Sequence, residues 1–464
     1  NYSVFCTFKR KTMANVTSIN PYSGKELASY KIHNKAELSE ILEKASKRFQ
    51  SWRETSFSER KKLMLAAAAE LKKNKQEYAE LMTKEMGKPI AQAIAEVEKC
   101  AWVCEYYAEE AAIQLADEII ETDAQKSYTS YEPLGVVLAV MPWNYPFWQV
   151  FRFAAPALMA GNIAVLKHAS NVFGSALNIE KVFKRAGFPD HCFSTLLIGS
   201  DKVEEVLENP IVKAVTLTGS GPAGGAVAEI AGRNIKKSVL ELGGNNALIV
   251  MADCDMEATL ETCVQARYQN TGQSCIAGKR LLLDERIEEE FTERLVQKVR
   301  ELKSGDPMDE ETFIGTLARE DLAEDLEEQV NKSIEQGATL LLGGKRQNAY
   351  FEPTILSGVT PKMTVFKEET FGPALSITIF QDLDEAIELS NDSKFGLGVS
   401  IFTKDVKTAE EQAFRLNEGA VFINELVKSD PRLPFGGVKA SGYGRELSKH
   451  GIREFVNRKT VYIK

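Results

Sequence analysis

The chain has 464 residues, of which 44% are apolar and 27% are charged, and its formal net charge is −9. This composition is that of an ordinary globular protein, and it excludes a disordered chain, a collagen-like repeat or a disulfide scaffold as an overall description. The mildly acidic charge argues against nucleic acid or an anionic membrane surface as a partner. No apolar run reaches the roughly 18 uncharged residues that a membrane span needs.

The seven cysteines are odd in number and spread along the chain. This usage indicates free thiols in a reducing compartment such as the cytoplasm. The four histidines show no metal-binding spacing, so we expect no metal site. At the start, the basic FKRK is not followed by the apolar segment of a signal peptide. We expect Met13 to be the true start and residues 1–13 to be a disordered or non-native arm.

The first quarter of the chain is predicted to be helical. Residues 35–120 carry apolar side chains at helical spacing, with Gly87 and Pro89 as interruptions. Cys100 and Cys104 share one helix face in this region and are expected to pack in the core. Residues 125–133 then alternate as a surface strand would.

From residue 136 onward, short apolar runs alternate with helix-like stretches. The predicted strands of a first sheet are 136–141, 163–167, 195–199 and 214–219, with helices at 174–187 and 201–208. A second such rhythm follows Gly243, with strands at 247–251 and 280–284, helices at 256–270 and 320–337 and another reaching 303, and a last strand at 454–464. Alternating strands and helices are typical of parallel sheets covered on both faces, a common nucleotide-binding layout.

A glycine-rich turn lies between a predicted strand and a predicted helix. Gly219-x-Gly221-x-x-Gly224 matches the dinucleotide fingerprint, in which backbone approaches a pyrophosphate at a helix N-terminus. Glu241 lies about where that pattern places its ribose carboxylate. A plain tight turn remains the alternative, because Pro222 removes one N–H that could face phosphate.

Cys275 lies in the small-polar segment QNTGQSCIAGKR. The neighbours Gly272, Gln273 and Ser274 argue for an accessible, reactive thiol rather than a buried one. A cysteine nucleophile needs a base, and no histidine lies in a comparable loop. Glu241 at the end of an apolar strand is the best-placed carboxylate, although it could also bind ribose or face solvent.

The segment PWNYPFW directly follows the predicted strand at 136–141. In a parallel sheet the carboxyl end of a strand is where ligands bind. The amide of Asn144 could donate to an oxyanion there, while a structural role in the turn is the alternative.

Together these segments resemble the aldehyde dehydrogenase superfamily. PWNYPFW, LTGS, ELGGNN, NTGQSC, EETFGP and PFGGVKASGYGRE stand in that family's order and approximate spacing. The resemblance implies that Cys275 is the nucleophile, that Glu241 is the general base, and that Asn144 and the Cys275 backbone N–H stabilise the oxyanion. It also implies an NADP or NAD cofactor held by Trp143, Lys167, Ser170, Gly219, Ser220, Gly224, Glu369 and Phe371. The implied reaction adds the thiolate to an aldehyde, passes a hydride to the nicotinamide and hydrolyses the remaining thioester, with no metal.

Within the superfamily, NELVKSDPRLPFGG and QNTGQSCIAGKR resemble the bacterial succinate-semialdehyde dehydrogenases. Their substrate needs a fixed cation for its distal carboxylate. Arg152 matches one arginine of that pocket, and a surface ion pair is the alternative reading of this residue. Gln269 stands where some members carry a second arginine, so Ser429 or Arg432 is expected to compensate.

Two departures from other members bear on cofactor choice and regulation. Ser170 stands where many members that exclude the 2′-phosphate carry glutamate, so we expect NADP to be accepted, with Lys167 and also His168 available to pair with the phosphate. Ala277 stands where some members carry the second cysteine of a redox switch, so we expect that regulation to be absent.

The fold predicted from these patterns is α/β. It comprises a doubly wound, Rossmann-like cofactor-binding domain (14–120 and 134–243), an α/β catalytic domain (244–440) and a small β extension (121–133 and 441–464). The strands of the extension have no evident sheet of their own, so we expect them to pair with another subunit in a homodimer or homotetramer.

Three other functions compete with this reading. A broad-range aliphatic or aromatic aldehyde dehydrogenase would suit the apolar PFW beside Asn144. A cysteine hydrolase or acyltransferase without a redox cofactor would have no use for Lys167 and the glycine turn. A binding or structural protein with a dead site would not need Cys275, Glu241 and Asn144 intact.

Overall fold

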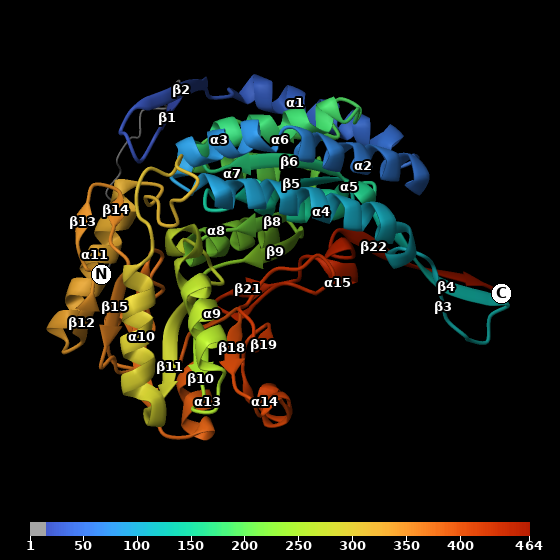
Figure 1. Ribbon diagram of the computed structural model, residues 1–464. Helices are drawn as coiled ribbons and strands as arrows, with labels where there is room; N and C mark the ends of the chain where they lie inside the picture. The colour runs from blue at the N-terminus through green and yellow to red at the C-terminus, as the bar shows by residue number, and fades with distance from the viewer. Residues whose placement is uncertain (1–14) are drawn as a thin grey trace, which may run out of the picture.

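The computed structural model describes residues 15–464. These residues form two large sheets that are connected by a short turn (Figure 1). The predicted arm at residues 1–13 lies outside this range. Strand β9 (Lys237–Glu241) of the first sheet leads through the turn at 242–245 into β10 (Asn246–Val250) of the second. The carboxyl ends of the first sheet therefore face the amino ends of the second. Across residues 15–464, no helix is both long and apolar enough to cross a bilayer.

The first sheet confirms the predicted doubly wound, Rossmann-like layout. Its strand order is β21-β9-β8-β5-β6-β7, with β5 to β9 parallel and β21 antiparallel. The strands other than β9 are β5 (Val136–Met141), β6 (Ile163–His168), β7 (Phe193–Thr195), β8 (Val212–Thr218) and β21 (Gly442–Tyr443). The chain order reverses between β5 and β8, and ligands of such sheets bind outside the carboxyl ends of the strands at that point.

Helices cover both faces of this sheet (Figure 1). They are α1 (Lys35–Trp52), α2 (Phe57–Lys73), α3 (Lys75–Met86), α4 (Ile90–Gln114), α5 (Trp148–Met159), α6 (Phe173–Arg185), α7 (Val203–Glu208), α8 (Gly221–Arg233) and α15 (Ser448–Ile452), with short 3-10 turns η1 (Ser170–Val172) and η2 (Ser200–Lys202). The starts of α1 and α2 are fixed by capping boxes. Cys100 and Cys104 of α4 are fully buried, as predicted.

One predicted strand is displaced along the chain. The pattern predicts a strand over 195–199, but β7 spans Phe193–Thr195 and shares only Thr195 with the prediction. Leu197 instead exchanges hydrogen bonds with His33: the His33 N–H donates to the Leu197 carbonyl (2.8 Å), and the Leu197 N–H donates to His33 Nδ1 (3.3 Å). An apolar run cannot reveal that its backbone is bonded to a loop so distant in sequence.

The second sheet has the order β12-β15-β16-β11-β10-β18-β19, parallel except for β12. Its remaining strands are β11 (Gly278–Asp284), β12 (Thr339–Leu342), β15 (Thr354–Ser357), β16 (Ala374–Phe380), β18 (Val399–Phe402) and β19 (Val421–Ile423). The helices around it are α9 (Met256–Tyr268), α10 (Glu288–Arg300), α11 (Glu320–Glu335), α12 (Thr364–Lys367), α13 (Leu383–Asn391) and α14 (Val406–Gln412), with 3-10 turns η3 (Gln269–Gly272), η4 (Glu285–Ile287) and η5 (Ala413–Arg415). Separate apolar clusters pack against its two faces.

Short antiparallel pairs complete the fold. They are β1 (Asn15–Ile19) with β2 (Glu26–Lys31), β13 (Arg346–Gln347) with β14 (Tyr350–Phe351), and β17 (Phe395–Gly396) with β20 (Val438–Lys439).

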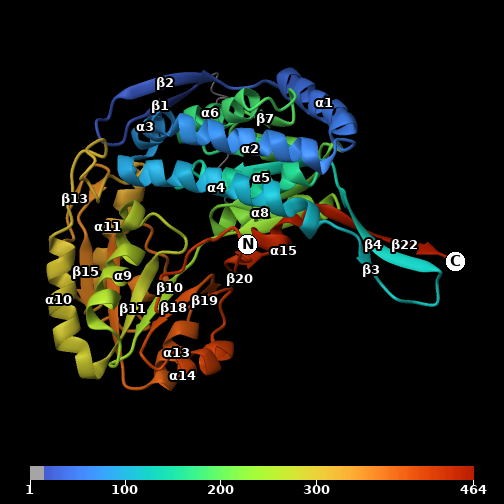
Figure 2. The same ribbon diagram turned by 45° about the vertical axis from the view of Figure 1, so that its right-hand side comes forward.

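A three-stranded arm projects from the body in both views (Figures 1 and 2). It consists of β3 (Glu118–Ile119), β4 (Lys126–Pro133) and β22 (Val456–Ile463). The two predicted strands of the extension are confirmed, but the expectation that they lack a sheet of their own is wrong. They pair with each other along their whole length, from Val456 opposite Pro133 to Ile463 opposite Lys126. Pairing of the arm with another subunit stays a prediction.

Candidate active site

A cavity of about 400 Å³ lies at the point where the order of the first sheet reverses. We call it the crevice cavity. Its walls come from the turns after β5 and β8 and from the junction between the two sheets. Seven of the predicted site residues line it: Trp143, Asn144, Gly219, Ser220, Cys275, Glu369 and Phe371. The structure therefore brings together residues from both lobes at the position that the topology indicates.

A second cavity, of about 160 Å³, lies beside helix α4. We call it the α4 cavity. It is lined by Cys275 and by three predicted substrate residues, Arg152, Gln269 and Ser429. Cys275 thus borders both cavities, and so does Gln149. A group held in the crevice cavity and another held in the α4 cavity would meet at the thiol.

The loop that carries Cys275 is more enclosed than its composition predicts. Gly272, Gln273 and Ser274 are all buried, so the expectation of an open loop is wrong, although Cys275 itself stays partly exposed. Gln273 is held by tertiary contacts: its side-chain oxygen accepts the Ala318 N–H (2.9 Å). Burial raises the pKa of the Cys275 thiol to about 11, although the positive charges of Arg152 and Lys279 oppose the shift.

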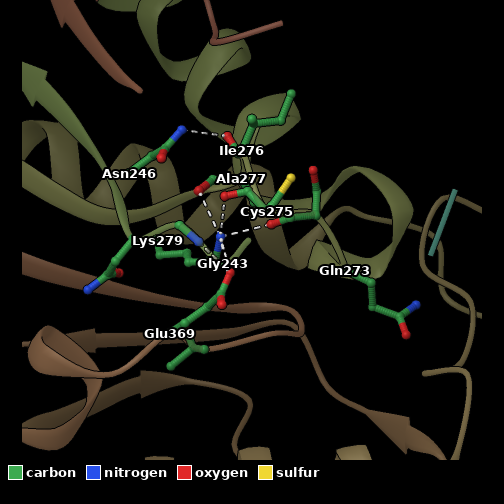
Figure 3. A network of polar contacts seen from close by, with 12 residues as sticks. Gly243, Asn246, Gln273, Cys275, Ile276, Ala277, Lys279 and Glu369 are labelled. Atoms are coloured by element: carbon green, nitrogen blue, oxygen red, sulfur yellow. Dashed lines mark hydrogen bonds and ion pairs between the residues drawn. The ribbon is translucent and has the colours of Figure 1, made fainter. Parts of the chain in front are cut away.

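The ammonium of Lys279 holds this loop from below (Figure 3). It is fully buried and donates to the carbonyls of Ser274 (2.8 Å) and Cys275 (2.9 Å), and more weakly to that of Ala277 (3.5 Å). It also lies 3.3 Å from the carboxylate of Glu369, which in turn accepts the Gly244 N–H (3.0 Å). One lysine therefore links the loop of the thiol to the acid that lines the crevice cavity. No sequence pattern singled out this residue.

Asn144 is buried and its side chain is fixed at both ends. Its Nδ2 donates to the Gln273 carbonyl (3.0 Å), and its Oδ1 accepts from Nε2 of Gln149 (3.0 Å). An amide nitrogen carries two hydrogens, so one remains for a group in the crevice cavity that Asn144 lines.

Glu241 lies close enough for its charge to act on Cys275, but it lines neither cavity. Its carboxylate is buried, and a Cβ placed on Gly436 would lie 2.7 Å from its Oε1. Neither carboxylate oxygen has a hydrogen-bond partner in residues 15–464. Burial raises the pKa of Glu241 well above its usual range, and the charge of Glu446 adds to this, while Arg152 and Arg445 oppose it.

Arg152 forms an ion pair, but a buried one rather than the surface pair of the alternative reading. Its Nε contacts the carboxylate of Glu446, its Nη2 donates to the hydroxyl of Thr218 (3.3 Å), and its guanidinium lies 4.6 Å from the ring centroid of Phe435. Burial raises the pKa of Glu446 even beside this arginine. Sequence analysis missed Glu446, although it ends the segment GYGRE, because nothing local pairs it with residue 152.

The other predicted cofactor residues lie around the carboxyl ends of β6 and β8. Lys167 is the second-last residue of β6 and is nearly buried, and burial lowers its pKa although Asp201 opposes the shift. Ser170 follows in η1 and is partly exposed. Gly224 lies inside α8, where a Cβ would collide with Leu242, so it permits the helix to pack closely and does not line the cavity.

His168 is not available to a phosphate. It is fully buried, its Nε2 lies 2.9 Å from the Pro146 carbonyl, and burial lowers its pKa to about 4. The ring is therefore neutral at physiological pH. The expectation that it could pair with a 2′-phosphate is wrong, because the strand directs its side chain inward rather than to the ribose side.

Of the residues expected to compensate for Gln269, the structure brings only one to the α4 cavity. Ser429 lines it, whereas Arg432 does not. Arg432 is mostly exposed and is paired with Asp430 through two contacts of 2.9 and 2.7 Å. The cavity instead contains a cation that sequence analysis missed, Lys99 of α4. Its neighbours in the helix, Cys100 and Ala101, suggested only core packing.

Comparison with known proteins gives a consistent result. The sequence profile of the aldehyde dehydrogenase family matches residues 8–461. A probable succinate-semialdehyde dehydrogenase (NADP(+)) of Synechocystis sp. is 49% identical over 452 residues, which are 97% of this chain and 99% of the relative. A succinate semialdehyde dehydrogenase (NAD(P)+) of Escherichia coli is 46% identical over 448 residues, 96% of this chain and 97% of the relative. The crystal structure of succinic semialdehyde dehydrogenase from Streptococcus pyogenes in complex with NADP+ has a TM-score of 0.94 at 37% identity, covering 97% of this chain and 99% of that chain.

Proposed function

The chain belongs to the aldehyde dehydrogenase family, and from this premise we propose that it oxidises succinic semialdehyde to succinate with NADP or NAD. The observation that carries the proposal is the position of Cys275 between the crevice cavity and the α4 cavity. The names of the relatives from Synechocystis sp. and Escherichia coli support the substrate and both cofactors.

The residues of the crevice cavity fit a dinucleotide. Gly219 and Ser220 lie at the exposed N-terminus of α8, where backbone N–H groups and the helix dipole favour a pyrophosphate. Trp143 and Phe371 meet edge to face (5.7 Å between centroids) and give the cavity an aromatic wall. We assign the ribose positions to Lys167, Ser170 and Glu369. The nicotinamide, when bound, supplies the acceptor for a hydride.

The chemistry of the thiol follows from its surroundings. The Cys275 sulfur adds to the aldehyde carbon, and the Asn144 amide and the Cys275 backbone N–H donate to the developing oxyanion. Loss of the hydride leaves an acyl group on the sulfur as a thioester. Because the pKa of the free thiol is about 11, the thiol gives up its proton to solvent water as the sulfur adds to the aldehyde.

We assign the water-activating role to Glu241, because burial raises its pKa and makes its carboxylate a stronger proton acceptor than a solvated one. This role requires its side chain to rotate from the side of Gly436 toward Cys275. The unbonded carboxylate oxygens favour such a rotation, because no hydrogen bond within residues 15–464 has to break.

A second candidate is an enzyme for uncharged aldehydes. The ring of Trp148 and that of Phe435 supply apolar wall to the α4 cavity, which would suit an aliphatic or aromatic substrate. Lys99, Arg152 and Ser429 in the same wall favour a charged one.

We also propose a homodimer or homotetramer that uses the arm. Its outer residues include exposed apolar side chains, among them Ile119, Tyr462 and Ile463. Apolar surface on projecting strands is favourable only when covered. The six described cysteines are free thiols, which fits the reducing cytoplasm.

The test of the proposed function is reduction of NADP or NAD by the purified chain with succinic semialdehyde, followed by absorbance. Cys275→Ala should abolish turnover, while Cys254→Ala, a thiol behind β10 in another apolar cluster, should retain it. Turnover that survives in Cys275→Ala, or no turnover of any aldehyde by the wild type, would contradict the proposal.

A further inference from the structure

Lys99 is a cation in the α4 cavity whose charge no acid neutralises. It lies on α4, and its Nζ lies 4.3 Å from the ring centroid of Trp148 and donates to the hydroxyl oxygen of Ser429 (3.0 Å). In residues 15–464 no ion pair involves Lys99. Both it and Ser429 line the same cavity as Cys275.

The acids nearest to Lys99 are committed elsewhere. Glu96 pairs with the buried Lys88, and its other oxygen accepts the N–H groups of Phe147 and Trp148 (both 2.9 Å). Asp430, itself buried, is paired with the exposed Arg432 (2.7 Å). Residues 15–464 therefore supply no carboxylate that pairs with this ammonium.

The hydroxyl of Ser429 supplies a further hydrogen-bond donor beside Lys99 in the α4 cavity. Its oxygen accepts two hydrogen bonds, from Lys99 Nζ (3.0 Å) and from Trp148 Nε1 (2.9 Å). An ammonium and an indole N–H can only donate, so neither takes the hydroxyl hydrogen of Ser429. That hydrogen and the remaining hydrogens of Lys99 form a group of donors that lacks an acceptor. Such a group is suited to an anion.

Arg152, a second cation of the wall, is already paired within the fold. Its charge offsets that of the buried Glu446, and the charge of Glu446 in turn raises the pKa of Glu241. Drawing the guanidinium toward a ligand would leave Glu446 without its ion pair and Glu241 with the charge of Arg445 alone. Lys99, in contrast, forms no ion pair within residues 15–464 that a ligand would have to break.

We propose that Lys99, with the hydroxyl of Ser429, binds the distal carboxylate of the substrate, and that Arg152 acts by holding Glu446 rather than by clamping the ligand. This inference rests on the proposed function, since it names the group that recognises the charged end of the aldehyde. Burial, together with the charge of Arg152, lowers the pKa of Lys99 to about 8, so a bound carboxylate would supply a stabilising counter-charge.

The test compares succinic semialdehyde with butyraldehyde, which has the same number of carbons and no charge. Lys99→Met keeps an unbranched side chain over Trp148 and removes only the ammonium. We expect the ratio of kcat/KM for the two aldehydes to fall about 10- to 100-fold, mainly through KM of succinic semialdehyde. Lys99→Arg should keep part of the preference, and Ser429→Ala should lose about three- to tenfold.

Lys75→Met is the matched control. Lys75 lines neither cavity, is partly exposed and is paired with Glu98 (2.5 Å), so the ratio should change by less than about twofold. An equal loss for both aldehydes in Lys99→Met, or an unchanged ratio, would overturn the role of Lys99.

A binding measurement separates this inference from the proposed function. Titration calorimetry with succinate, the expected product, needs no turnover. If the wild type binds succinate and Lys99→Met binds it at least tenfold more weakly, the carboxylate site is supported. That result would hold even if the enzyme oxidises an aldehyde other than succinic semialdehyde. A wild type that prefers succinic semialdehyde while Lys99→Met binds succinate equally well overturns the site and leaves the function standing.

Discussion

The fully buried ammonium of Lys279 lies 3.3 Å from the carboxylate of Glu369, which is partly exposed. The pair joins the loop of Cys275 to the wall of the crevice cavity. Lys279 also donates to the carbonyls of Ser274 and Cys275, so it orders the backbone that carries the proposed oxyanion donor. One side chain therefore links the thiol to the cavity proposed for the cofactor.

Lys279→Met should lower the free energy of unfolding by about 3 kcal/mol, because it leaves the carboxylate of Glu369 and the loop carbonyls without their buried donor. Denaturant unfolding followed by circular dichroism measures this. Lys298→Met, which removes an exposed lysine paired with Glu257, is the control and should change stability by less than about 1 kcal/mol. Equal effects of the two variants would show that the network adds no stability.

In the enzyme without ligands, the thiol of Cys275 should react slowly with alkylating reagents at neutral pH. Its pKa of about 11 exceeds the ordinary thiol value, so below pH 11 the thiolate fraction rises about tenfold per pH unit. The rate of alkylation by iodoacetamide should therefore climb from pH 7 to pH 10 without a plateau, with Cys275→Ala as the blank. A plateau below pH 8 would mean that Arg152 and Lys279 outweigh burial.

Glu241→Gln should separate the two halves of the reaction. Acylation needs no activated water, so a stoichiometric burst of reduced cofactor should persist while steady turnover falls by a factor of about 100 or more. Stopped-flow absorbance resolves the two phases. Absence of both a burst and a trapped thioester would indicate another role for Glu241, such as ribose binding.

Ser170→Glu should shift the enzyme from NADP toward NAD. A carboxylate at this partly exposed position near Lys167 would repel a 2′-phosphate and accept a hydrogen bond from a free ribose. The ratio of kcat/KM for NADP to that for NAD should fall at least about tenfold. Ser170→Gln, of similar size but uncharged, distinguishes charge from bulk. A wild type without detectable NADP activity is the contrary result.

Arg152→Leu should destabilise the protein by about 3 kcal/mol and lower activity on charged and uncharged aldehydes alike, since it strands the buried Glu446. Adding Glu446→Leu should recover at least about 1 kcal/mol of the loss in denaturant unfolding. A selective loss of succinic semialdehyde oxidation by Arg152→Leu, with stability unchanged, would instead restore the arginine as the clamp.

Sequence patterns predicted the sheets well because parallel strands buried on both faces are apolar along their whole length, as in Val136–Met141. They also selected Cys275 and Asn144, whose neighbours are unusual in composition. They failed where a contact between distant residues decides the outcome. The burial of Gln273 depends on Ala318, and the commitment of Arg152 depends on Glu446.

Lys99 is another residue whose role the sequence patterns did not predict. A lysine within a helix normally faces water, and its spacing gave no warning of a cavity. The available signal was its position between Glu96 and Cys100, which are both buried, on a helix with an apolar face. A charged residue in such a place merits attention as a ligand-binding candidate.

Because β21 belongs to the first sheet, this sheet cannot be completed during synthesis until the C-terminal part of the chain has been made. Tyr443 pairs with Leu240, and Gly442 with Glu241, so the edge of β9 is closed by residues made about two hundred positions later. Until these residues leave the ribosome, β9 presents an open edge that can pair with other chains. A ribosome-bound fragment that ends before residue 440 should therefore depend on chaperones, although every residue proposed for catalysis has already been made.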